Sequence, residues 1–342
     1  MGCATVIRVR TAPFLDPGQG SRRKNALRSD PFAVSSLSVT APPPPATPPF
    51  DTRLRDAVSL AAALVALTKP RLAFFSVLTA MTAYGTGTRA TFTAHALLTL
   101  LGTTLAAAGA LSLNQWWERR TDALMRRTRQ RPLPLGQLSP FFALSWSLSL
   151  SFAGVAILAA FINLSSAAFA AATILIYGLV YTPLKRRTRW ATEIGSISGA
   201  LPPLLGAAAA DNLSSPHAWI LTVVLLLWQM PHFFAIGWMH RADYRAAGFP
   251  LLPATDSTGR RTALWSFGYT VALLVVSVSA WSLEDVGAVY GGTALVAGGW
   301  LLARAGRFLF SPHSRDPAAR RLFAATILYL PVVLVALLID RF

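Results

Sequence analysis

Long apolar segments constrain this chain more than any other feature of its sequence. Nine of them follow residue 70, and several approach the length of about 20 residues that a helix needs to cross the hydrocarbon of a membrane. The segments are 72–88, 94–117, 140–160, 164–182, 192–210, 217–239, 263–283, 286–303 and 322–339. Charged residues make up only 13% of the chain, about half of their share in soluble domains. The sequence therefore predicts an all-α, polytopic membrane protein with a bundle of about nine transmembrane helices.

The basic residues orient these segments in the membrane. With nine spans and the N-terminus inside, 23 of the 25 Lys and Arg residues from Arg53 onward lie on the inner side. Only Arg89 and Arg341 lie on the outer side. This asymmetry follows the positive-inside rule, so we expect an inside N-terminus. The net charge of +17 is thus explained by membrane orientation and does not indicate a nucleic-acid partner.

Residues 1–50 differ in composition from the rest of the chain. They include the proline-rich run 41–49 and no apolar segment long enough to span a membrane. We predict a disordered Arg/Pro-rich tail, followed by an integral-membrane domain over 51–342. An Arg-rich, acid-poor N-terminus is also typical of an organelle transit peptide, and this alternative stays open. The short tail favours a bacterial cell inner membrane over a mitochondrial inner membrane.

The first candidate site follows the second apolar segment. Asn114, Glu118 and Asp122 recur every four residues, so on a helix their oxygens line one face over two turns. Such oxygens suit Mg²⁺, which proteins usually hold with one or two carboxylates plus phosphate oxygens and water. Arg126 and Arg131 follow, and guanidinium groups bind phosphate well. The stretch predicts a metal–diphosphate site at the inner mouth of the bundle.

A second interpretation of this stretch needs no ligand. Glu118 and Asp122 could pair with neighbouring arginines on a solvated helix end, and those arginines could hold the loop on the inner side. For an isolated helix end this plainer interpretation would be preferred. Matching signals in two later blocks shift the balance toward a binding site.

The first of these blocks, 181–189, ends the fourth apolar segment. Its Lys185 and Arg186 suit diphosphate, although they would serve equally well as an inner anchor for the helix. The second block begins with Gln229 and His232 inside the sixth segment. Polar groups at membrane depth usually face the bundle interior and often have a function, although a lone His is more often hydrogen-bonded to a neighbouring helix. Asp243 then lies just past the end of that segment.

Four blocks together resemble the UbiA-type intramembrane prenyltransferases, in particular the branch that acts on heme. The blocks are Thr68-Lys69-Pro70-Arg71; Asn-Gln-Trp-Trp-Glu-x-x-x-Asp-x-x-Met-x-Arg-Thr-x-x-Arg-Pro-Leu (114–133); Tyr181-Thr182-x-x-Lys185-Arg186-x-Thr188; and Trp228-Gln229-x-Pro231-His232-Phe233 through Asp243-Tyr244-x-x-Ala247-Gly248-x-Pro250-x-Leu252-Pro253. Their order and spacing are far more specific than any single block.

The resemblance implies a central cavity and transfer of a farnesyl group from farnesyl diphosphate to heme b, which gives heme O for terminal oxidases. It implies Mg²⁺ as cofactor, and as partners the lipid bilayer and heme A synthase or terminal oxidase assembly factors. It assigns catalysis and metal binding to Asn114, Glu118, Asp122 and Asp243; diphosphate binding to Arg126, Arg131, Lys185, Arg186, Lys69 and Arg71; and the heme pocket to His232, Gln229 and Trp228.

Two departures from the general family pattern concern the acids. Position 118 is Glu, and Ala247 stands where a second acid would follow Asp243 by one turn. Both departures resemble the heme branch, and they leave the number of Mg²⁺ ions open. One alternative function is prenylation of an aromatic quinone precursor, against which the block 228–253 argues. Another is membrane transport, but the internal repeats typical of transporters are not evident.

Overall fold

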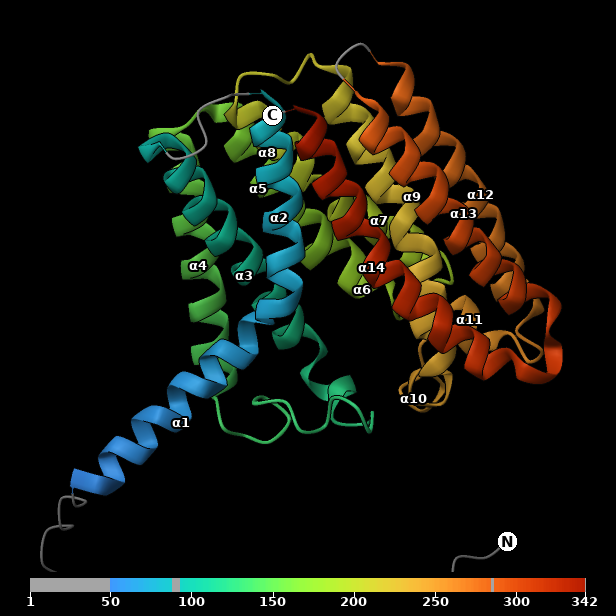
Figure 1. Ribbon diagram of the computed structural model, residues 1–342. Coiled ribbons are helices and arrows are strands. Elements are labelled where there is room, and N and C mark those ends of the chain that lie inside the picture. The colour runs from blue at the N-terminus through green and yellow to red at the C-terminus, as the bar shows by residue number, and fades with distance from the viewer. Residues whose placement is uncertain (1–49, 88–92, 284–285, 342) are drawn as a thin grey trace, which may run out of the picture. The chain divides into compact units, whose positions relative to one another are not determined.

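The computed structural model describes residues 50–87, 93–283 and 286–341, and these form helices and loops without any β-strand. The main helices are α1 (Phe50–Thr68), α2 (Pro70–Gly87), α3 (Ala94–Asp122), α4 (Pro140–Phe161), α5 (Leu164–Leu175), η1 (Ile176–Tyr181), α6 (Thr182–Leu184), α7 (Ala191–Ala200), α8 (Pro202–Ala209), α9 (Pro216–Met239), α10 (Arg241–Ala246), α11 (Leu252–Thr255), α12 (Arg260–Ser279), α13 (Ala288–Phe310) and α14 (Arg315–Arg341) (Figure 1). Short 3₁₀ turns, η2 (Ala280–Ser282) and η3 (Pro312–Ser314), precede α13 and α14. The predicted tail lies outside the described residues except for its last residue, and Arg89 lies outside them too.

Over their described residues, all nine predicted apolar segments are largely helical, which confirms the all-α fold class. Within the described residues, six helices are long and apolar enough to cross a membrane, or seven if the bent pair α1–α2 counts as one span. Two of the predicted segments, 192–210 and 286–303, are not among these candidate spans. The segment 192–210 is divided into the short helices α7 and α8, and α13 contains five glycines and two arginines that lower its hydropathy. The number nine and the inside N-terminus remain predictions.

The helix α1 was not expected from the apolar pattern. It ends at Thr68. The next residue, Lys69, has a left-handed φ of 47°, and α2 leaves at 49° to α1. The last turns of α1 bury Ala63 and Leu67 against Leu133 and Leu138 of the loop that follows α3. This packing holds the break at Lys69 close to the last turns of α3, where Lys69 contacts Asn114.

The helices α3 and α4 pack with their backbones in close approach. A Cβ atom on Gly154 of α4 would lie 2.5 Å from the backbone nitrogen of Ala106 and 2.7 Å from the carbonyl oxygen of Gly102, both in α3. Helices in lipid gain little from apolar side chains alone, so small residues that allow such close contact stabilise their association. The tight pair fixes the position of α3, which carries the first candidate site.

Contacts between helices run in a closed circuit. From α2 they pass through α3, α5, α7, α9, α12, α13 and α14, and α14 returns to α2. Figure 1 shows α2 and α14 side by side. The helix α9 also packs directly against α14, where Trp228 Nε1 donates a hydrogen bond to the Thr326 carbonyl at 2.7 Å. This circuit places the ends of α3, α6 and α9 near one another.

Candidate functional site

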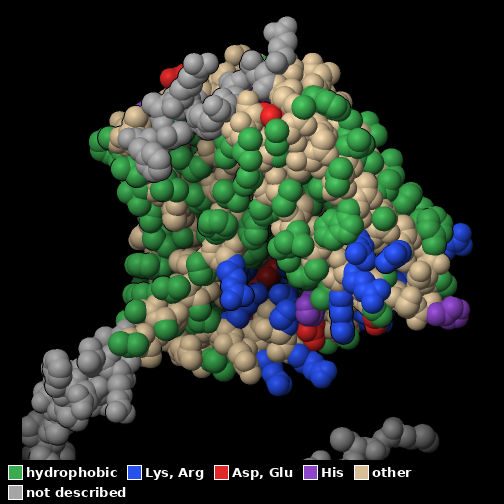
Figure 2. Space-filling view, in the orientation of Figure 1, with side chains coloured by type: hydrophobic (Ala, Val, Ile, Leu, Met, Phe, Trp, Pro, Cys, Tyr) green, Lys and Arg blue, Asp and Glu red, His purple; other side chains and the backbone are tan. Residues whose placement is uncertain are grey.

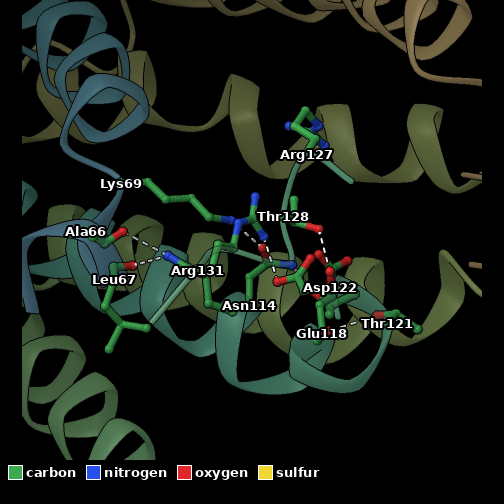
Figure 3. A network of polar contacts seen from close by, with 12 residues as sticks. Ala66, Leu67, Lys69, Asn114, Glu118, Thr121, Asp122, Arg127, Thr128 and Arg131 are labelled. Atoms are coloured by element: carbon green, nitrogen blue, oxygen red, sulfur yellow. Dashed lines mark hydrogen bonds and ion pairs between the residues drawn. The ribbon is translucent and has the colours of Figure 1, made fainter. Parts of the chain in front are cut away.

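The last turns of α3 present Asn114, Glu118 and Asp122 on one buried face, as their spacing predicted (Figure 3). We call these three residues the acid face. They are only 2%, 6% and 1% exposed, respectively. A solvated helix end would expose its carboxylates, so the burial argues against the interpretation that Glu118 and Asp122 are ordinary surface acids.

Asn114, the first residue of the acid face, is hydrogen-bonded on both sides of its amide group. The Lys69 ammonium, at the break between α1 and α2, donates to Asn114 Oδ1 at 2.7 Å. Asn114 Nδ2 donates in turn to Thr182 Oγ1 at 3.1 Å, and Thr182 donates to the Tyr177 carbonyl. The amide is therefore oriented with its oxygen toward Lys69. Gln115 secures the same corner, because its Nε2 donates to the carbonyls of Ala66 and Leu67.

Glu118 is paired with Lys185, which lies just beyond the end of α6. The Lys185 ammonium is 3.0 Å from Glu118 Oε1, and it lies 5–6 Å from the ring centres of Tyr181, Tyr244 and Phe249. Burial, the largest single effect, lowers the pKa of Lys185. The Glu118 carboxylate and the tyrosines raise it, and the result is a pKa well above the ordinary value. Lys185 is thus a buried cation at neutral pH.

Asp122 is paired within its own loop. Arg131 donates to Asp122 Oδ2 at 2.7 Å, and Thr128 donates to the Asp122 carbonyl at 2.9 Å. The other carboxylate oxygen, Oδ1, is buried and has no hydrogen-bond partner within the described residues. Buried acceptors of this kind are costly unless a ligand satisfies them.

The second predicted acid, Asp243, lies in α10 and meets the loop that follows α3. Its Oδ1 accepts a hydrogen bond from the backbone nitrogen of Arg126 at 3.4 Å. The residues that follow Arg126 and Asp243 are also in contact, since Arg127 donates to the Tyr244 hydroxyl at 3.5 Å. The structure therefore brings together the two acidic segments, 117 residues apart in sequence.

The other predicted diphosphate residues lie at the rim. Arg71, Arg126 and Arg186 are exposed, and none of them forms an ion pair within the ranges that the structure covers. Figure 2 shows Lys and Arg side chains gathered at this end of the bundle, around a hollow in which an acidic side chain is visible. We call this the basic end. Its rim can attract an anion toward the acid face.

The donor set of the acid face suits Mg²⁺. Two carboxylates and one amide oxygen are hard ligands, and Asp122 Oδ1 is an unused acceptor. Among the described side chains, no three His, Cys, Asp or Glu residues are grouped closely enough to hold a metal by themselves. An ion here would therefore need oxygens from a ligand or from water, which Mg²⁺ commonly uses.

The three predicted heme-pocket residues face two different neighbours. Trp228 and His232 stack at 5.2 Å, and His232 Nδ1 lies 2.9 Å from Thr326 Oγ1 of α14. Gln229 instead faces α7, where its Nε2 donates to the Ser196 carbonyl at 3.3 Å. The structure thus brings together Trp228 and His232 but not Gln229.

Several residues around the site were not singled out from the sequence. Thr182, Tyr244 and Phe249 surround the acid face or Lys185. Thr182 and Tyr244 stand in the blocks that carry the resemblance but had no role assigned to them, and Phe249 was not named. Glu193 is different. One of its carboxylate oxygens is buried at the start of α7 without a partner in the described part of the chain, and an acid inside the apolar segment 192–210 is a signal that could have been noticed.

The chain is similar to known prenyltransferases. The model of the UbiA prenyltransferase family matches residues 73–327. A protoheme IX farnesyltransferase of Opitutus terrae is 44% identical over 277 residues, which cover 80% of this chain and 93% of that protein. The protein of the same name from Solibacter usitatus is 41% identical over 72% of this chain and 83% of its own length.

Solved structures show the same fold at low identity. A structure of digeranylgeranylglyceryl phosphate synthase has a TM-score of 0.69 at 17% identity and covers 82% of this chain and 98% of its own. A UbiA homolog from Archaeoglobus fulgidus, bound to GPP and Mg²⁺, has a TM-score of 0.56 at 16% identity, with 80% and 99% covered. Since the family model spans most of the chain and the relatives match over most of their length, the chain belongs to the UbiA prenyltransferase family.

Proposed function

We propose that this chain transfers the farnesyl group of farnesyl diphosphate to a vinyl group of protoheme IX, releases diphosphate and forms heme O. It is a multi-pass membrane transferase. The relatives that share 44% and 41% of its residues are protoheme IX farnesyltransferases, and the alignments cover most of each protein. The observation that carries the proposal in the structure is the buried acid face with its cations at the mouth of an apolar bundle.

The cations of the site can stabilise the diphosphate as it leaves the farnesyl group. As the bond between the farnesyl C1 atom and the diphosphate oxygen breaks, negative charge develops on the diphosphate. Lys185 and Arg131 are positioned to stabilise that charge, and Lys69 adjoins them. Arg71, Arg126 and Arg186 on the rim would guide the diphosphate inward. When bound, Mg²⁺ would neutralise further charge on the same group, held by Asn114, Glu118, Asp122 and Asp243.

The allylic group that remains needs an apolar surrounding, because water would convert it to farnesol. The vinyl group supplies the electron pair for the new carbon–carbon bond, and water completes the hydroxyethylfarnesyl side chain. Among the described residues, the helices beyond the acid face pack in buried apolar clusters that include aromatic side chains.

We assign the heme side of the site to Trp228 and His232. Both lie on the face of α9 that packs against α14, beside Phe323 at 4.9 Å from the His232 ring. Flat stacked rings suit a porphyrin face. His232 lies about two turns before the end of α9, and Asn114 lies about two turns before the end of α3. Gln229 would support α9 against α7.

The cellular setting is also part of the proposal. The distribution of basic residues and the relatives from bacteria support a bacterial inner membrane, with the basic end facing the cytoplasm. The product would then pass to heme A synthase or to assembly factors of a terminal oxidase.

The decisive experiment is mass analysis of hemes extracted from bacteria that lack heme O and express this chain. We expect a new heme that is heavier than heme b by one farnesyl group and one water. Unchanged heme, with the protein shown to be inserted, would contradict heme as the acceptor. In that case, assays with aromatic quinone precursors would test the remaining acceptor class of the family.

A further inference from the structure

Aromatic side chains from the start of α7 and from α12 meet at the surface of the bundle. Trp190, immediately before α7, lies edge-on to Trp265 of α12, with ring centres 5.9 Å apart. Trp265 in turn lies 5.8 Å from Tyr269, which is one turn further along α12. Both tryptophans are 42% exposed. Their rings therefore face the lipid near the basic end, at the depth where amphipathic aromatic rings settle in a membrane.

Two side chains of opposite charge lie beside these rings without pairing with each other. Glu193, in the first turn of α7, interacts electrostatically with Arg189 and with Tyr269. The Arg189 guanidinium lies 4.9 Å from the centre of the Trp190 ring. Within the described residues, neither Glu193 nor Arg189 forms an ion pair. We call Arg189, Trp190, Glu193, Trp265 and Tyr269 the Glu193 cluster.

The carboxylate of Glu193 has one unused acceptor. Its Oε2 atom is buried yet has no hydrogen-bond partner in the described part of the chain. A buried acceptor without a donor is costly, so this oxygen indicates a ligand that can donate a hydrogen bond. The neighbouring rings favour a cation, because the face of a Trp or Tyr ring attracts an ammonium group. The carboxylate and the rings together suit a cation that carries N–H groups.

Trp300 and Arg304 of α13 show an ordinary interfacial contact in the same chain. Trp300 is 38% exposed, and the Arg304 guanidinium lies 5.5 Å from its ring centre. In the ranges that the structure covers, no second ring packs against Trp300 and no acid pairs with Arg304. The Glu193 cluster adds two further rings and an acid with an unused oxygen. Anchoring of a helix at the membrane surface explains the pair in α13 but not these additions.

We propose that the Glu193 cluster binds the headgroup of phosphatidylethanolamine, a phospholipid with a primary ammonium group, in the leaflet at the basic end. The ammonium group donates to Glu193 Oε2 and lies against the aromatic rings, and the phosphate binds the Arg189 guanidinium. A zwitterionic headgroup thus matches both charges of the cluster. Phosphatidylcholine fits less well because its quaternary nitrogen has no N–H group, and phosphatidylglycerol offers Glu193 no cation. The inference goes beyond the proposed function and does not depend on it.

The same turn of α7 connects this cluster to the candidate site. Ala191 and Gly195 each lie two residues from Glu193, about 200° around the helix, and so face the other way. Ala191 is buried in the same apolar cluster as Tyr244, and Gly195 packs against the Tyr181 ring. A lipid bound at the Glu193 cluster therefore stabilises the helix start whose other face borders the site.

Native mass spectrometry of the full chain tests the choice of lipid. The delipidated protein in detergent is titrated with phosphatidylethanolamine, phosphatidylcholine and phosphatidylglycerol of identical acyl chains. We expect the first to bind with a dissociation constant at least about fivefold lower than the other two, because it alone satisfies Glu193 with a hydrogen bond. Equal binding of the ethanolamine and choline lipids would overturn the proposal. Tighter binding of phosphatidylglycerol would also overturn it, since Arg189 alone would then explain the site.

Variants of the cluster test the residues. Glu193→Gln keeps the size of the side chain and removes its charge, so the dissociation constant for phosphatidylethanolamine should rise at least about fivefold, and that for phosphatidylglycerol should change less than about twofold. Trp265→Leu should weaken phosphatidylethanolamine in the same direction. Trp300→Leu is the matched control, because it removes an equally peripheral tryptophan beside an arginine, and it should leave the binding unchanged.

Thermal unfolding without added lipid establishes that each variant is folded. If the folded Glu193→Gln variant binds phosphatidylethanolamine as tightly as the wild type, the proposal is wrong. An equal loss in Trp300→Leu and Trp265→Leu would reduce the effect to general lipid contact and overturn it as well. Binding is measured without prenyl diphosphate or heme, so none of these outcomes bears on the proposed transferase function.

Discussion

At the scale of single residues, burial decides which polar groups belong to the site. Lys185 and Arg186 are neighbours with the same charge, yet Lys185 is 9% exposed and paired with Glu118, whereas Arg186 is exposed. Nothing in the local sequence ranks one of these two residues above the other. A buried ion pair stabilises a protein only where both partners are well satisfied by further contacts. Here three aromatic rings also surround the Lys185 ammonium.

Removal of the acids should abolish transfer. We expect Glu118→Ala and Asp122→Ala each to lower the turnover of farnesyl transfer by at least ~100-fold, because the Mg²⁺ that would stabilise negative charge on the departing diphosphate loses a ligand. Turnover is measured with protein shown to be inserted and folded. Asp316→Asn, at the start of α14 and bonded to Trp238 and Arg241 away from the acid face, is the matched control. Full activity in both Ala variants would refute the assignment.

His232 should affect one substrate more than the other. We expect His232→Ala to weaken heme binding by roughly tenfold, or about 1.4 kcal/mol, because the stacked ring beside Trp228 is lost. Binding of a farnesyl diphosphate analogue should change less than twofold. Heme binding is measured by absorbance titration and analogue binding by calorimetry, with Thr222→Val on the same helix as control. The reverse pattern would place His232 outside the heme pocket.

At the scale of helices, close packing of small residues fixes where the acid face lies. Gly154 of α4 approaches the backbone of α3 at Ala106 and Gly102, so α3 cannot shift without a clash. The sequence indicated both helices but not their contact, because helices with little amphipathic character do not reveal which side faces a neighbour. The contact depends on matched small residues on the two helices.

A methyl group at this contact should destabilise the bundle. We expect Gly154→Ala to lower stability by about 1–3 kcal/mol, since the added Cβ atom would meet backbone atoms that cannot rotate away. Gly268→Ala in α12 is the control, because its Cβ atom would meet nothing within 4 Å. Thermal unfolding in detergent compares the two. If Gly154→Ala is as stable as Gly268→Ala, the α3–α4 contact is not as tight as described.

At the scale of the whole molecule, the predicted metal and diphosphate residues lie at one end of the bundle. The loops after α3, α6 and α9 converge at the basic end, which Figure 2 shows as a hollow rimmed by Lys and Arg. The sequence predicted this convergence from the count of basic residues alone. The same count predicts which side of the membrane the site faces.

Labelling of single cysteines should establish that orientation. In a Cys3→Ser background, we expect Arg187→Cys, at the basic end, to react with an impermeant maleimide only from the cytoplasmic side. Ser214→Cys, in the exposed turn between α8 and α9, should react only from the opposite side. Inverted and right-side-out vesicles provide the two faces. Labelling of both positions from the same side would contradict the predicted topology.

The sequence by itself determined the helical membrane fold, the spacing of the acid face and the family, because hydropathy, period and motif order are properties read along the chain. It did not determine α1 as a helix, the left-handed break at Lys69 or the separation of Gln229 from His232. Only the tertiary structure decided which cation holds which oxygen. Those partners lie 45 and 67 residues apart for Asn114 and Glu118, and packing between helices, rather than local sequence, selects them.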